Sequence, residues 1–131
     1  EASMSLRSPL SRVLGSGSAK DGTEHWWMQR VTAVALLIIG LWFLVSIASL
    51  ADYDRAELYR WAGHPFHAVM LILASITLAW HSTLGVQVIV EDYVHGPLLK
   101  VSALLLNKFL HVFLAAAAVL AVLKIALGDS L

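Results

Sequence analysis

Three long stretches of almost unbroken apolar residues alternate with short polar segments along the chain. They run from about residue 26 to 50, from 65 to 91 and from 98 to 127. Each is longer than the roughly 20 apolar residues with which a helix crosses the hydrocarbon core of a bilayer. No fourth stretch and no internal repeat are visible. The pattern therefore predicts an all-α membrane protein with three transmembrane helices.

Turn-forming residues predict where these helices begin and end. The polar segment between the first two spans can form a short interfacial helix, with Asp52 or Asp54 as its N-cap. Pro65 is expected to open the second span, because a proline at the first helical position loses no hydrogen bond. The pair Gly96 and Pro97 predicts a short turn before the third span.

The polar residues before the first span are expected to form an extended arm. This arm covers residues 1–24 and contains a flexible Gly-Ser-Gly-Ser patch at 15–18. Residues 1–3 precede Met4 and are expected to be a remnant of cloning. No short apolar run precedes a small-residue cleavage site, so no signal peptide is predicted. The expected organisation is this arm followed by a three-helix anchor domain at 25–131.

Composition agrees with a membrane protein and limits its chemistry. Of the 131 residues, 59% are hydrophobic and only 14% are charged, whereas about a quarter of the residues in soluble proteins are charged. The net charge of zero gives no reason to expect a nucleic-acid partner. The chain has no cysteine, so any haem must be held without covalent attachment. Three helices with several polar side chains are expected to form part of a heteromeric bundle.

The distribution of Lys and Arg predicts the orientation in the membrane. Most cations lie in the arm or at its junction with the first span, and in the loop after the second span: Arg7, Arg12, Lys20, Arg30 and Lys100. The two arginines of the first loop are offset by three acids. By the positive-inside rule, the N-terminus is expected in the cytoplasm of a bacterium and the C-terminus in the periplasm.

His81 is the most informative polar residue, because it lies deep in the second apolar stretch. An imidazole there costs free energy in lipid and is expected to face a partner inside a bundle. If the helix continues, Asp92 lies about 16 Å further along the axis and only about 20° around it. One helix face then carries a candidate metal ligand and, at the membrane surface, Asp92 beside Tyr93.

Residues 80–94, Trp-His-Ser-Thr-Leu-Gly-Val-Gln-Val-Ile-Val-Glu-Asp-Tyr-Val, resemble the second-helix signature of the small cytochrome b anchor subunits of succinate dehydrogenase. In that signature a His is followed by a Gly four residues later and then by an Asp-Tyr pair. Residues 22–33, Gly-Thr-Glu-His-Trp-Trp-Met-Gln-Arg-Val-Thr-Ala, are similar to the start of the first helix in this family. The three-span plan and the chain length match as well.

The resemblance implies a function in the respiratory chain and the tricarboxylic acid cycle. Together with a large cytochrome b anchor subunit, such chains attach a flavoprotein subunit and an iron–sulfur subunit to the membrane. The complex oxidises succinate and reduces a quinone such as ubiquinone. This chain lacks a flavin-binding glycine fingerprint and iron–sulfur cysteines, so succinate oxidation is expected on the other subunits.

The resemblance also implies site residues for the two expected cofactors. His81 would be one axial ligand of a b-type haem, with the second ligand on the large anchor subunit, and Gly85 would leave room for the macrocycle. His25 and Arg30 would lie in the vicinity of the haem propionates, although both can also be ordinary residues of the membrane interface.

For the quinone, Tyr93 can donate a hydrogen bond to a carbonyl oxygen, and Asp92 is expected to support the site by orienting a cation. Tyr93 can instead be an aromatic of the interfacial belt.

Two other interpretations of the whole chain remain open. The chain can be a haem-free structural anchor, or a transporter subunit in which Lys108, His111 and Asp92 form a proton path. Structural roles are favoured for Lys108 and His111, and Lys108 can also reach a lipid phosphate at the interface. His67 could hold a second haem, but it lies at the outer end of its span, where a solvated His is expected instead.

Overall fold

The computed structural model describes residues 18–128 and is helical almost throughout. Its helices are α2 (Ser18–Ala48), α3 (Arg55–Gly63), α4 (Pro65–Tyr93) and α5 (Pro97–Leu127). Three segments are long and apolar enough to cross a membrane: Gly22–Ala48, Pro65–Tyr93 and Pro97–Leu127. Residues 18–128 contain no strand. The structure thus confirms an all-α membrane protein with three transmembrane helices.

The helix boundaries follow the prediction at Pro65 and differ at Pro97 and at the arm. Pro65 opens α4, as predicted, whereas Pro97, predicted to lie in the turn before the third span, is the first residue of α5. At the arm, α2 begins at Ser18, so the last part of the segment expected to be extended is helical. Once the apolar turns have formed, each further residue adds a backbone hydrogen bond, which favours continuing the helix into polar sequence. The rest of the arm, residues 1–17 with Arg7 and Arg12, lies outside the described residues.

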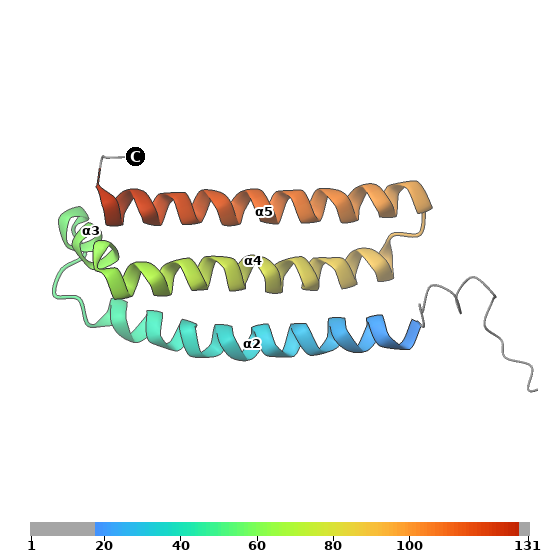
Figure 1. Ribbon diagram of the computed structural model, residues 1–131, viewed down its shortest axis with the longest axis horizontal. Helices are drawn as coiled ribbons and strands as arrows, with labels where there is room; N and C mark the ends of the chain where they lie inside the picture. The colour runs from blue at the N-terminus through green and yellow to red at the C-terminus, as the bar shows by residue number, and fades with distance from the viewer. Residues whose placement is uncertain (1–17, 129–131) are drawn as a thin grey trace, which may run out of the picture.

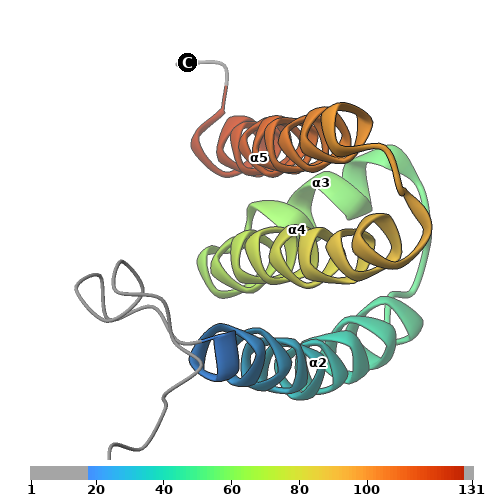
Figure 2. The same ribbon diagram turned by 90° about the vertical axis from the view of Figure 1, so that its right-hand side faces the viewer.

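The three long helices form a single open layer with α4 in the middle (Figures 1 and 2). Within the described residues α4 contacts both α2 and α5, but α2 and α5 have no contact with each other. The start of α2, the end of α4 and the start of α5 lie at one end of the layer, and α3 lies at the other (Figure 1).

The open layer buries very little of its own surface. The buried residues of the described part are Thr32, Ala62, Ala68 and Asn107. Most large apolar side chains remain exposed on the isolated chain, among them many Leu, Val and Phe residues of all three long helices. Such a layer needs lipid or other transmembrane subunits to cover its two faces.

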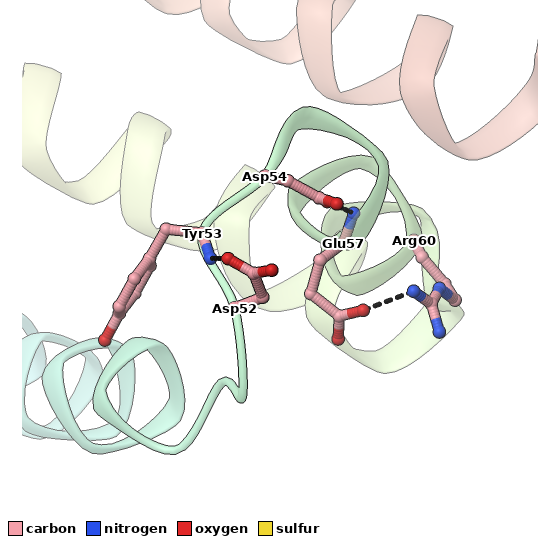
Figure 3. Close-up of polar contacts among 5 residues, drawn as sticks. All are labelled: Asp52, Tyr53, Asp54, Glu57 and Arg60. Atoms are coloured by element: carbon pink, nitrogen blue, oxygen red, sulfur yellow. Dashed lines mark hydrogen bonds and ion pairs between the residues drawn. The ribbon is translucent and has the colours of Figure 1, made fainter.

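The turn before α3 confirms one of the two predicted N-caps. The carboxylate of Asp54 accepts a hydrogen bond of 2.7 Å from the backbone N–H of Glu57 and so caps α3. The carboxylate of Asp52 instead accepts from the N–H of Tyr53 at 2.7 Å. One turn into the helix, Arg60 forms an ion pair with Glu57 (Figure 3). Polar contacts therefore fix this loop at the α3 end of the layer.

His67 is packed among aromatic rings at the α3 end of the layer, so the expectation of a solvated side chain is wrong. Its Nδ1–H donates to the carbonyl oxygen of Trp61 at 2.8 Å, and its ring lies 5.7 Å from that of Trp42 and 5.9 Å from that of Phe66. The Trp61 indole N–H in turn donates to the hydroxyl of Ser46 at 2.8 Å. The short α3 helix packs on α5 and α4, and its Trp61 ring lies between Trp42 of α2 and His67 of α4.

Candidate functional site

His81 lies near the middle of α4 and points into the seam between α4 and α2. Its Nδ1 lies 2.9 Å from the hydroxyl oxygen of Thr32 on α2. Thr32 is only 5% exposed, so water does not compete for this contact. Two residues that lie 49 positions apart in the sequence thereby join α2 and α4 by a polar contact in the apolar part of the layer.

The surroundings of Thr32 determine how the ring of His81 is protonated. The Thr32 hydroxyl oxygen also lies 2.8 Å from the carbonyl oxygen of Met28 and 3.2 Å from that of Gln29. A carbonyl oxygen only accepts hydrogen bonds, so the single hydroxyl proton of Thr32 is donated to the α2 backbone. Nδ1 of His81 must then donate to the Thr32 oxygen. In the neutral imidazole this leaves Nε2 with its lone pair, which is the form that binds a metal.

Within the described part, the second ring nitrogen of His81 is unpaired, and a glycine and a second unpaired imidazole lie near it in sequence or on the facing helix. Among residues 18–128, Nε2 of His81 has no hydrogen-bond partner. One turn further along α4, a Cβ added to Gly85 would contact only the side-chain amide of Gln29, at 3.8 Å. His25 lies on the same face of α2 as Thr32, and its Nε2 is buried without a partner in the described part. A buried polar atom without a partner costs about 1–3 kcal/mol, which favours a partner from outside the described residues.

Arg30 does not join His25 in this seam. The two residues are about 140° apart around α2, at 3.6 residues per turn. The Arg30 guanidinium instead lies over the ring of Trp26, 5.5 Å from its centroid, in a cation–π contact. Of the two residues expected near haem propionates, the structure brings only His25 to the face that carries Thr32.

Asp92 and Tyr93 end α4 at the same end of the layer as the start of α2. Both are exposed, and Tyr93 is 77% exposed. Within the described residues neither side chain makes a hydrogen bond, so both are available to a ligand, a partner or the lipid headgroups. Neighbouring residues hold the helix end: Gln87 donates to the Glu91 carboxylate at 2.8 Å, and Lys100 donates to the Glu91 carbonyl oxygen at 2.9 Å.

A second histidine, His111, occupies the other seam, between α4 and α5. Its Nδ1 lies 2.8 Å from the carbonyl oxygen of Asn107, and its Nε2 lies 2.9 Å from the hydroxyl of Ser82. The carbonyl can only accept, so Nδ1 carries the proton and the Ser82 hydroxyl donates to Nε2. The side-chain amide of Asn107 also donates to the carbonyl oxygen of Thr83 at 3.0 Å. Both nitrogens of His111 are therefore used within this chain.

The residues of the alternative proton path are not linked to one another. His111 bonds only to Asn107 and Ser82, whereas Lys108 is exposed on an apolar groove of about 530 Å³ between α4 and α5. No hydrogen bond connects Lys108 or Asp92 to His111 in the part of the chain that the structure describes. The same part holds no group of three or more His, Cys, Asp or Glu that could bind a metal ion.

The sequence analysis did not identify Thr32, which holds His81. A signal was present, since Thr32 is the one hydroxyl residue in the otherwise apolar stretch from 31 to 45. Whether Thr32 faces His81 depends on how far α2 is shifted along its axis relative to α4, and only the structure shows this.

Comparison with known proteins gives consistent matches over most of the chain. Residues 4–123 match the family described as succinate dehydrogenase/fumarate reductase transmembrane subunit. The succinate dehydrogenase hydrophobic membrane anchor subunit of Paracoccus denitrificans is 31% identical over 120 residues, which cover 92% of each chain. The subunit of the same name from Rickettsia bellii (strain RML369-C) is 30% identical over 117 residues, 89% of this chain and 94% of the relative. No solved structure matches.

Proposed function

Since the chain belongs to the family of succinate dehydrogenase/fumarate reductase transmembrane subunits, we propose that it does more than anchor the complex. In this proposal it provides one axial ligand of a b-type haem and forms part of the site at which a quinone is reduced. Succinate oxidation takes place on a flavoprotein subunit and an iron–sulfur subunit. Of these functions, the anchor is the established one, and the haem and quinone roles are the proposal.

The observation that carries the haem proposal is the unpaired Nε2 of His81 in the middle of α4. The residues around it fit a haem. Gly85 has no side chain, and a Cβ there would meet only the flexible Gln29 side chain, at 3.8 Å; the buried, unpartnered Nε2 of His25 can meet a propionate. The second axial ligand comes from the large anchor subunit. When bound, the haem supplies a one-electron carrier inside the membrane.

Tyr93 and Asp92 are the proposed contribution to the quinone site. The Tyr93 hydroxyl can donate a directed hydrogen bond to a quinone carbonyl oxygen while its ring packs against the apolar quinone headgroup. Ionised Asp92 only accepts hydrogen bonds, so it orients a cation of a partner subunit instead of donating to the quinone. The exposure of both side chains on the isolated chain supports this role.

The open layer supports a heteromeric assembly. Three helices that bury so few of their own residues have two faces left for lipid and for the large anchor subunit. The proposed orientation has the Tyr93 end of the layer in the cytoplasm of a bacterium, with the C-terminus in the periplasm. The flavoprotein and iron–sulfur subunits then dock at the Tyr93 end, and ubiquinone is the expected acceptor.

A spectrum of the purified four-subunit complex tests this proposal. The expected result is a b-type band in the dithionite-reduced-minus-oxidised spectrum, together with succinate-dependent reduction of a ubiquinone analogue. An active complex with a flat spectrum would instead identify a haem-free structural anchor. A complex that oxidises succinate but reduces no quinone would contradict the quinone proposal while leaving the anchor function in place.

A further inference from the structure

We propose that Thr32 is the positioning residue for His81, which sets both the tautomer and the orientation of its imidazole ring. This inference rests on the proposed haem ligation. It assigns a function to a residue of α2 that touches neither the iron nor the quinone, and it explains why a hydroxyl is buried in the middle of an apolar span.

The Thr32 hydroxyl is itself held in place by the α2 backbone. Its donation to the carbonyl oxygen of Met28, at 2.8 Å, restricts the rotation of the side chain. The oxygen lone pair therefore points in a defined direction across the seam. Because Thr32 is 5% exposed, neither water nor lipid can replace this acceptor.

The contact of 2.9 Å then restrains the imidazole ring of His81. The ring can rotate about its Cα–Cβ and Cβ–Cγ bonds. A hydrogen bond at Nδ1 restricts both rotations. Nε2, on the opposite side of the ring, is presented in one direction with its lone pair free. Partners of this kind fix the tautomer of a metal-binding His and raise its basicity, and their loss commonly lowers metal affinity by about 10–100-fold.

The hydrogen bond should also affect the electron affinity of the haem. The Thr32 oxygen donates its own proton to a carbonyl, which makes it a better acceptor for the Nδ1–H of His81. A stronger bond at Nδ1 increases electron donation from Nε2 and so favours ferric over ferrous iron. Removing the hydroxyl is expected to raise the haem midpoint potential.

Two variants of Thr32 and one matched control test this inference in the complete complex. Thr32→Val keeps the branched shape and removes the hydroxyl, whereas Thr32→Ser keeps the hydroxyl. Thr83 on α4 makes the same type of backbone bond, to the carbonyl oxygen of Ala79 at 2.7 Å, but its hydroxyl contacts no histidine. Thr83→Val therefore controls for the loss of a threonine hydroxyl that is bonded only to its own helix.

The readouts are haem per flavin, the low-spin electron paramagnetic resonance signal and the midpoint potential. For Thr32→Val we expect about 10–100-fold weaker haem retention, a shifted or broadened low-spin signal and a raised potential. Thr32→Ser and Thr83→Val should match the unmodified complex. If the haem signal and potential of Thr32→Val are also unchanged, Thr32 is only a contact between helices and the inference is overturned.

Two further outcomes keep this test separate from that of the proposed function. If the unmodified complex contains no haem, the haem proposal fails, and the inference about Thr32 fails with it. If Thr32→Val does not assemble, Thr32→Cys replaces it, because a thiol is a weak acceptor. The Cys variant should then have a higher potential than Thr32→Ser, and equal potentials overturn the inference.

Discussion

The two seams of α4 each contain a histidine that bonds to a hydroxyl of the neighbouring helix, but they use it differently. In the α4–α5 seam, His111 donates through Nδ1 to Asn107 and accepts through Nε2 from Ser82, so its hydrogen-bonding capacity is used within the chain. In the α2–α4 seam, His81 donates to Thr32 and keeps Nε2 unpaired among the described residues. Of these two histidines, only His81 has a ring nitrogen that is available to a ligand from outside the described residues.

The difference extends to the polar atoms nearby. Two buried side-chain atoms of the described part have no hydrogen-bond partner: Nε2 of His25 and Oδ1 of Asn107. The Asn107 amide is held through its NH₂ group, which donates to the Thr83 carbonyl oxygen, while its own oxygen stays without a partner among the described residues. His25 has no such anchor in the structure and lies on the face of α2 that carries Thr32. The α2–α4 seam therefore differs from the other in having, among the described residues, two imidazoles with an unpaired nitrogen, His81 and His25.

The largest effect short of removing His81 is expected from filling the space beside it. A Cβ at Gly85 would meet only the Gln29 amide at 3.8 Å, so the chain itself can accommodate a small side chain there. Replacing an interior helical Gly with Ala or Leu should even favour the helix by up to about 1 kcal/mol. A macrocycle packed against Gly85 would nevertheless be displaced by Gly85→Leu, and we expect most of the haem to be lost from an assembled complex.

Gly85→Ala is the graded control, with an intermediate loss expected. Haem per flavin in the purified complexes gives the measurement. Full haem content in an assembled Gly85→Leu complex would show that no macrocycle packs against this part of α4.

A smaller, severalfold effect is expected from Tyr93→Phe at the end of α4. This change keeps the aromatic ring and removes only the hydroxyl. If that hydroxyl donates to the quinone, the loss of one hydrogen bond of about 1 kcal/mol should reduce succinate-to-quinone turnover several times. Succinate oxidation with an acceptor that takes electrons from the flavin should stay normal, as should the haem spectrum. Unchanged quinone reduction would leave Tyr93 as an aromatic of the membrane interface.

The smallest effect should come from a substitution in the α4–α5 seam, which is expected to change only the stability of the complex. Ser82→Ala removes the donor to Nε2 of His111 and leaves that nitrogen unpaired, at an expected cost of about 1–3 kcal/mol. The thermal midpoint of the complex should fall by a few degrees, with unchanged haem and quinone turnover. Ser75→Ala is the matched control, because Ser75 donates only to the Leu71 carbonyl of its own helix, at 2.8 Å. A shifted haem spectrum in Ser82→Ala would contradict the separation of the two seams.

The sequence predicts the helices of this protein well and their contacts poorly. Long apolar stretches and Pro65 locate the three spans, and the carboxylates at Asp52 and Asp54 reduce the N-cap of α3 to two candidates, of which the structure selects Asp54. The pairing of His81 with Thr32 depends on the axial register and rotation of two helices, which an apolar pattern with few polar marks does not determine. The aromatic surroundings of His67 have the same cause, since they depend on how α3 packs.

The most direct test of the account compares His81→Ala with His111→Ala in the complete complex, by the reduced-minus-oxidised spectrum and the low-spin resonance signal per flavin. Both changes remove a membrane histidine that bonds across a seam of α4, so effects on assembly are matched as closely as this chain allows. The account predicts that His81→Ala loses the haem or converts it to a high-spin form, while His111→Ala keeps a normal low-spin haem in a less stable complex. A full low-spin signal in His81→Ala, or its loss in His111→Ala alone, would contradict the assignment of His81 as the ligand.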